Sequence, residues 1–216
     1  MNPERWALIA LSLILAIGYV VGLWINRRKS RTVYRWIRRG LRGVWGQEPQ
    51  GAWLGSMATG ARLQLRGAGP FRQIEVVFLL QMREVLPLWL FNRVRGKGDE
   101  LVIRGQLRRG VPVEWELRPS AKQPQGLENF RAVAMPAGWT GWQAPPDARP
   151  WPSWEAFLER YGPALRGISL RRQQPHLILR GDLGRLMRLA PDSETFFADL
   201  RNVFTEPREP ADAHAD

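Results

Sequence analysis

Residues 6–25 read WALIALSLILAIGYVVGLWI, twenty residues without a charged side chain. A helix of this length rises about 30 Å, which matches the hydrocarbon thickness of a bilayer. Trp6 and Trp24 lie at the two ends of the run, and tryptophan prefers the headgroup level. The run is longer than the apolar part of a signal peptide, about 7–15 residues, and no A-x-A-like cleavage site follows it. The sequence therefore predicts a retained transmembrane helix, with residues 1–26 as the anchor.

The charges on the two sides of this run differ. Glu4 and Arg5 precede it, whereas eight Lys or Arg residues follow it between positions 27 and 42, with no acid before Glu48. Lys and Arg close to a span stay on the cytoplasmic side. The sequence thus predicts a single-pass signal-anchor protein of the cell membrane, with its N-terminus outside and its C-terminal domain in the cytoplasm. The absence of cysteine agrees with a reducing compartment, although many secreted domains also lack cysteine.

Two glycines inside the apolar run form a GxxxG pair, Gly18 and Gly22. Small residues let two transmembrane helices approach closely, so a homodimer through Gly18 and Gly22 is one hypothesis. The other is that the pair only reflects the frequency of glycine in such helices.

Residues 27–46 predict a basic amphipathic juxtamembrane helix, because apolar side chains recur every three or four positions and arginines fill the other face. Such a helix can lie on a membrane that contains anionic lipids. Alternatively, the arginines serve only as the topology signal. The residues expected at the lipid surface are Arg27, Arg28, Lys29, Arg31, Arg35, Trp36, Arg38, Arg39 and Arg42.

The net charge of +12 is concentrated near the anchor. Residues 1–42 contain nine of the 32 basic residues and one of the 20 acids, which leaves 23 basic and 19 acidic residues for the rest of the chain. A nucleic-acid-binding protein needs a basic face on its globular part. We therefore expect no nucleic acid among the partners.

Residues 51–204 predict a cytoplasmic α+β domain that folds without the anchor. Alternating segments predict an antiparallel meander of four or five strands, and three helices and a hairpin are expected near the C-terminus. Residues 86–94 fit either a strand or a helix. The Pro- and Gly-rich segment 119–152 is a candidate sub-boundary, and residues 205–216 predict a disordered tail. The strand segments are 61–66, 72–81, 100–108 and 111–118, with 130–135 as a further candidate; the hairpin strands are 167–172 and 176–180, and the helices are 154–161, 182–189 and 192–204.

The residue inventory limits the chemistry. With no cysteine and two histidines, and with no metal-site or nucleotide-binding motif, the sequence predicts no metal and no cofactor. Glu75 and Glu84 interrupt apolar sequence and are candidate catalytic carboxylates. Their structural alternative is a paired charge, with Arg83, Arg93 or Arg104 as the partner.

Two further groups could bind a ligand or a partner. Arg171, Arg172 and His176 surround a predicted hairpin turn and could bind an anion, because arginine forks match phosphate geometry. The alternative is an exposed basic turn. The tryptophans of the irregular segment are expected to form an exposed partner-binding patch, since tryptophan is common at binding hot spots. They are Trp139, Trp142 and Trp151.

The sequence leaves two candidate functions for this protein. The first is a membrane-anchored, non-catalytic scaffold or accessory subunit of a membrane complex, with a protein partner. The alternative is a membrane-bound enzyme that acts on a phosphorylated or lipid substrate through carboxylates and arginines. A concave site that gathers Glu75, Glu84 and the 171–176 turn would favour the enzyme.

Overall fold

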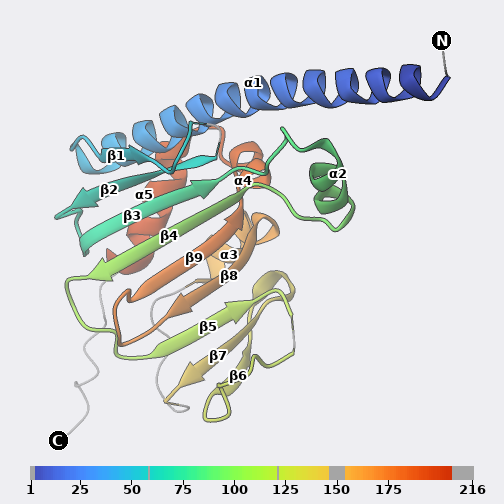
Figure 1. The fold of residues 1–216 in the computed structure, drawn as a ribbon. Coiled ribbons are helices and arrows are strands. Elements are labelled where there is room, and N and C mark those ends of the chain that lie inside the picture. Colours follow the sequence, from blue (N-terminus) through green and yellow to red (C-terminus); the bar gives the residue numbers. More distant parts are fainter. Residues whose placement is uncertain (1–2, 58, 121, 146–153, 206–216) are drawn as a thin grey trace, which may run out of the picture.

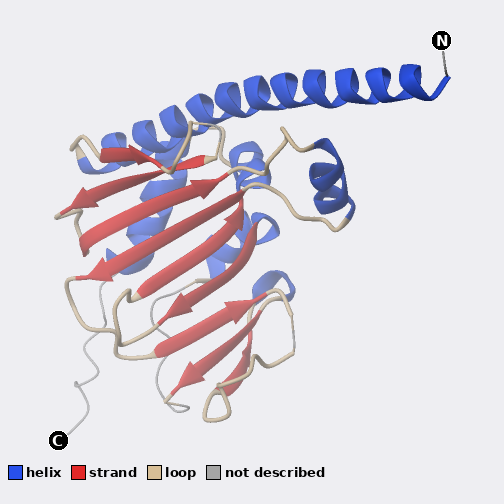
Figure 2. Cartoon of the chain, viewed as in Figure 1, coloured by secondary structure: helices blue, strands red, loops and turns tan. Residues whose placement is uncertain are grey.

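The computed structural model describes residues 3–57, 59–120, 122–145 and 154–205. It contains one long N-terminal helix and a single open sheet, with most of the shorter helices on one face of that sheet (Figure 1 and Figure 2). The protein is therefore α+β, as its sequence predicts.

The first helix, α1 (Pro3–Trp45), is unbroken over 43 residues. Its N-terminal half projects beyond the sheet, and its C-terminal half lies along the domain (Figure 1). Exposed apolar side chains surround the projecting half, among them Leu8, Ile14 and Val20. By length and composition α1 can cross a membrane. It is consistent with the predicted transmembrane or signal-anchor helix.

Within the described residues the sheet has nine strands, each antiparallel to its neighbours, in the order β1-β2-β3-β4-β9-β8-β5-β7-β6. Alternating apolar and polar residues place one set of side chains in the core and the other on the opposite face. The strands are Gln50–Trp53 (β1), Gly60–Arg66 (β2), Phe71–Leu79 (β3), Glu100–Leu107 (β4), Glu114–Arg118 (β5), Arg131–Ala134 (β6), Thr140–Ala144 (β7), Leu165–Leu170 (β8) and Leu177–Asp182 (β9).

The order of the strands differs from a simple meander in two respects, one of which is that β7 lies between β5 and β6. Strands β2, β3 and β4 pair in sequence order as predicted, but β9 and β8 lie between β4 and β5. The hairpin β8–β9 forms as expected. Strands β1 and β7 were not predicted, because they are short and β7 lies inside the irregular segment 119–152. Pairing between β4 and β9 joins segments far apart in sequence, which periodicity cannot reveal.

The remaining helices are short. The segment that fitted either a strand or a helix is helical and forms α2. Asp182 caps α4, since its Oδ1 accepts a hydrogen bond from the Arg185 N–H at 2.9 Å. Residues 206–216 of the predicted tail lie outside the described residues. The bounds are Leu86–Val94 (α2), Glu155–Tyr161 (α3), Leu183–Leu189 (α4) and Ser193–Thr205 (α5), with 3-10 turns at Pro136–Gly138 and Gly162–Ala164.

The core lies between the sheet and helices α1, α3, α4 and α5. Helix α5 contributes Phe196 and Phe197, and α1 contributes Val33, Ile37 and Leu41, all with no exposed surface. The apolar face of residues 27–46, expected on the membrane surface, is thus packed inside the protein. The predicted boundary at residue 26 lies inside α1. The part of α1 that follows this boundary packs in the same core as the strands that follow residue 51.

Candidate functional site

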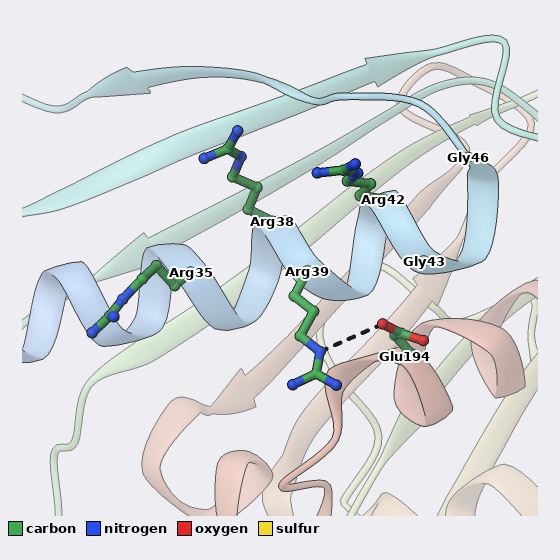
Figure 3. Close-up of a pocket in the computed structure, with 7 residues that line it drawn as sticks. All are labelled: Arg35, Arg38, Arg39, Arg42, Gly43, Gly46 and Glu194. Atoms are coloured by element: carbon green, nitrogen blue, oxygen red, sulfur yellow. Dashed lines mark ion pairs between the residues drawn. The ribbon is translucent and has the colours of Figure 1, made fainter.

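Four arginines on the outward side of α1 form what we call the arginine face. They line a shallow hollow of about 480 Å³ together with Gly43, Gly46 and Glu194 of α5 (Figure 3). Four helical positions three or four apart share one side of a helix, which explains why they gather. The arginine face consists of Arg35, Arg38, Arg39 and Arg42.

Two acids partly neutralise the arginine face. Arg39 lies 3.5 Å from Glu194, and Glu48 contacts both Arg38 and, at 3.9 Å, Arg42. The hydrogen bond between Arg38 and Glu48 raises the pKa of the arginine and lowers the pKa of the glutamate. These are surface pairs, which contribute little to stability. Because the side chains of Arg38, Arg39 and Arg42 remain at least half exposed, their guanidinium groups keep N–H groups that can contact an anion.

Trp36 does not belong to this exposed surface. Its side chain is buried, and its Nε1–H donates a hydrogen bond to the carbonyl of Ala190 at 3.0 Å. The indole also packs against Phe196 and Phe197, with ring centroids 6.3 and 6.1 Å away. The assignment of Trp36 to the lipid surface is therefore wrong. Tryptophan on the apolar side of an amphipathic helix fits a membrane interface and a protein core equally well.

A polar network, here called the junction network, lies where α1 meets the segment between β3 and β4. Nη2 of Arg83 donates hydrogen bonds to both carboxylate oxygens of Asp99, at 3.1 and 2.8 Å, and Asp99 Oδ2 lies 2.5 Å from Lys29 Nζ. Asn26 receives a hydrogen bond from Arg83 at 2.6 Å and donates one to Glu84 at 3.0 Å. The junction network thus consists of Asn26, Lys29, Arg83, Glu84 and Asp99.

Asp99 is the acid at the centre of this network. Burial alone raises its pKa, but hydrogen bonds from Arg83, Lys29 and the backbone N–H of Gln81 bring the pKa below its ordinary value. The aspartate therefore stays ionised and holds cations from two elements together. Lys29, predicted at the lipid surface, is part of this network, whereas Arg27, Arg28 and Arg31 are exposed.

The second face of the sheet is covered by none of the described helices, and we call it the open face (Figure 2). Its centre is apolar: Val77 pairs with Val102, and Ile178 lies diagonally next to Val102 on β9. All three are partly exposed. The arginines around this centre are Arg62, Arg104 and Arg180, all exposed.

The two candidate catalytic glutamates lie in different places. Glu75 sits on the open face between Arg104, at 3.4 Å, and Arg62, at 3.5 Å. Glu84 belongs to the junction network. The pairing of Glu75 with Arg104 agrees with the structural alternative that the sequence offered.

The predicted anion site is also occupied by protein contacts. Arg171 donates hydrogen bonds to Glu116 and to the carbonyl of Trp115, at 2.8 and 2.9 Å. The backbone N–H of Arg172 is bound by Glu114 at 2.9 Å, and Nδ1 of His176 accepts the N–H of Leu107 at 2.9 Å. This turn is thus tied to β5 and β4. It lies apart from both candidate glutamates.

The predicted tryptophan patch is not exposed. Trp139 is 3 % exposed and Trp142 is 1 % exposed, so neither can form a surface on the folded chain. Trp142 belongs to β7 and pairs in register with Glu116. Trp151 lies outside the described residues. The expectation of an exposed patch is therefore wrong for Trp139 and Trp142, because β6 and β7 give their segment a regular structure that its composition did not reveal.

The glycine pair of the apolar run contacts the same chain. A Cβ on Gly18 would come within 2.3 Å of Leu86 Cδ1, and one on Gly22 within 2.3 Å of the Arg83 carbonyl oxygen. The side of α1 that carries these two glycines thus packs closely against the segment that leads into α2. A dimer through Gly18 and Gly22 would have to displace that segment.

No protein-family model matches this chain, and no curated protein matches it. Three features of the site escaped the sequence reasoning: the open face, the junction network and the contact between α1 and α2. The apolar residues of the open face could have been noticed, because Val77, Val102 and Ile178 occupy the outward positions of alternating strands.

Proposed function

We propose that this protein is a single-pass membrane-anchored scaffold, or an accessory subunit of a membrane complex, whose cytoplasmic domain binds a protein partner through the open face of its sheet. The observation that supports the proposal best is the composition of the open face. Interfaces combine an apolar centre with a polar rim in which arginine is enriched. Val77, Val102 and Ile178 supply such a centre, and the surrounding arginines supply such a rim.

The junction between anchor and domain suits this role. Because α1 continues without a break from the apolar run into the core, the span and the sheet move as one body. A partner on the open face would therefore be held at a fixed orientation to the membrane. A flexible linker would hold it only within a certain distance.

The arginine face is better placed for a protein or a soluble anion than for lipid. Arg35 and Arg42 follow Ile25 by ten and seventeen residues, which puts them about 15 and 25 Å beyond the end of the apolar run along the axis of α1. The headgroup layer is only about 5–8 Å thick on each side. With an ordinary tilt of about 20°, contacts with anionic lipids are left to Arg27, Arg28 and Arg31.

The orientation rests on the basic flank alone. With the domain in the cytoplasm, a cytoplasm-active reporter fused after residue 216 is expected to be active, and one that is active only outside is expected to be silent. The reverse pattern would overturn the orientation and leave the scaffold role open on the other side.

Photo-crosslinking of the full chain in its own membrane tests the partner surface. A photoreactive phenylalanine in place of Arg104, on the open face, should yield an adduct of one defined mass, and the same probe in place of Asn202 of α5 should not.

The triple variant Val77→Thr, Val102→Thr and Ile178→Thr should reduce that adduct at least tenfold, because these changes remove the apolar centre and keep strand propensity. Leu189→Thr, an exposed apolar position on α4, is the matched control. Equal adducts from both probes, or none from Arg104, would refute the proposal.

The alternative, a membrane-bound enzyme, needs carboxylates and arginines that face a common substrate. Glu75, Glu84 and Arg171 each lie in a separate set of protein contacts. The placement of these residues therefore gives the enzyme no support, and the scaffold is the function that we carry forward.

A further inference from the structure

Helix α2 is apolar almost throughout, and none of its residues is buried. Leu90 is 59 % exposed, Phe91 52 % and Val94 83 %. A nine-residue helix that packs little of its surface gains almost nothing from the core of its own domain. Its apolar side chains therefore need another environment.

The position of α2 next to α1 indicates which environment that is. Leu86, the first residue of α2, packs on Gly18, and the preceding Arg83 and Glu84 pack on Gly22. In Figure 1, α2 stands beyond the end of the sheet, on the side towards which α1 projects. The two helices enclose a groove of about 580 Å³ whose walls include Ile17, Val21, Leu86 and Trp89.

The level of this contact along α1 can be worked out. Gly18 precedes Ile25, the last residue of the apolar run, by seven residues, so it lies about 10 Å inside that end of the run. If the apolar run spans a bilayer, Leu86 lies at the same depth. Helices that lie in a membrane interface bury their apolar face by about 5–10 Å.

The charges around α2 fit the same geometry. Arg93, Arg95 and Lys97 lie at its C-terminal end, where they can reach phosphate groups, and Arg95 stacks over the ring of Phe91 at 4.2 Å. Arg83, which borders the groove, is paired with Asp99 and Asn26. The polar groups at this level are thus paired or able to reach the lipid–water boundary, as a lipid environment requires.

From these observations we propose that α2 is a second membrane-inserted element, which lies in the cytoplasmic leaflet beside α1, and that phospholipid acyl chains fill the groove between the two helices. The inference rests on the proposed anchor, because only a membrane around α1 places lipid at the level of α2. A second inserted element beside α1 limits how far the span and the domain can tilt together relative to the membrane plane.

Site-directed spin labelling of the full chain tests this insertion, because the chain contains no cysteine that would compete for the label. Leu90→Cys and Phe91→Cys report on α2, Val20→Cys reports on the span, and Ala132→Cys on the distant edge strand β6 is the aqueous control. Each variant carries a nitroxide in nanodiscs of phosphatidylcholine and phosphatidylglycerol. The collision rates with oxygen, which concentrates in lipid, and with a water-soluble nickel complex are then compared.

We expect the oxygen-to-nickel ratio at Leu90 and Phe91 to exceed that at Ala132 at least fivefold and to approach that at Val20. A lipid-like ratio at Val20 with a water-like ratio at Leu90 and Phe91 would overturn the insertion and leave the anchor intact. Water-like ratios at all four positions would overturn both. Labels at Leu90 and Phe91 that are shielded from both reagents would overturn the insertion in favour of a protein contact, with a second copy of this chain included.

Discussion

Trp36 distinguishes a core helix from a membrane-surface helix, so its replacement is the most informative single change. Trp36→Ala removes a buried indole, its two aromatic contacts and its hydrogen bond to Ala190. Large-to-small changes of this kind cost about 3–5 kcal/mol. About 1 kcal/mol of that comes from the hydrogen bond, and about 0.5–1.5 kcal/mol from each aromatic pair. Native domains have only about 5–15 kcal/mol of stability in total.

The assay is urea unfolding of the full chain in detergent micelles, followed by circular dichroism. The apolar run stays helical in micelles, so the change in ellipticity reports on the domain. With a urea slope of about 2 kcal/mol per molar, Trp36→Ala should lower the unfolding midpoint by about 1.5–2.5 M. Trp36→Phe should lower it less, because much of the ring packing remains. Arg31→Ala, an exposed position on α1, should change the stability by less than about 0.5 kcal/mol.

One result would refute this reasoning. If Trp36→Ala left the midpoint unchanged and instead weakened the binding of the chain to anionic vesicles, the apolar face of residues 27–46 would lie on the membrane. The expected outcome is a lower urea midpoint for Trp36→Ala, with the binding to anionic vesicles unchanged.

Three further predictions concern the contacts of the domain. The stability that Asp99 contributes should be complete above about pH 4 and decrease as the pH falls through its lowered pKa, whereas Asp99→Asn should show a flatter acid profile and a loss of about 3–5 kcal/mol at pH 7 in thermal unfolding scans. Gly22→Leu should push the segment at Arg83 away from α1, because a Cβ there would lie 2.3 Å from a backbone oxygen, and trypsin should then cleave after Arg83 faster than in the unchanged chain. Arg171→Ala should destabilise the domain by about 1–3 kcal/mol, because it leaves the buried carboxylate of Glu116 with one partner fewer, and the affinity for inorganic phosphate measured by calorimetry should not change.

The sequence predicts most of the helices and strands, but it does not predict which of them pair or pack together. Strands β2 and β4 follow from alternation, β3 follows from its β-branched and aromatic residues, and α5 follows from apolar residues on one helical side. The position of β9 beside β4 could not be predicted, since the two strands are more than seventy residues apart and many apolar strands could have paired. Strand β7 was missed because its glycine, glutamine and tryptophan give no clear alternation.

The candidate site shows the same division. Periodicity correctly grouped the four arginines of the arginine face on one side of a helix. It also grouped Val33, Ile37 and Leu41 on the opposite side, but it could not tell whether lipid or protein covers them. Both environments favour the same apolar side chains, because burial of apolar surface depends on area and has no direction. Only the packing of α5 against α1 decides between them.

The twenty uncharged residues and the eight basic residues that follow them determined, from the sequence alone, that α1 has an apolar half and a basic half. Local composition is sufficient for that, since helix length and hydropathy are properties of consecutive residues. The tertiary structure decided what each half contacts: the basic half completes the core, and Gly18 and Gly22 in the apolar half admit α2. These contacts join residues that are distant along the chain, and the fit of their shapes is set only when the whole sheet has formed.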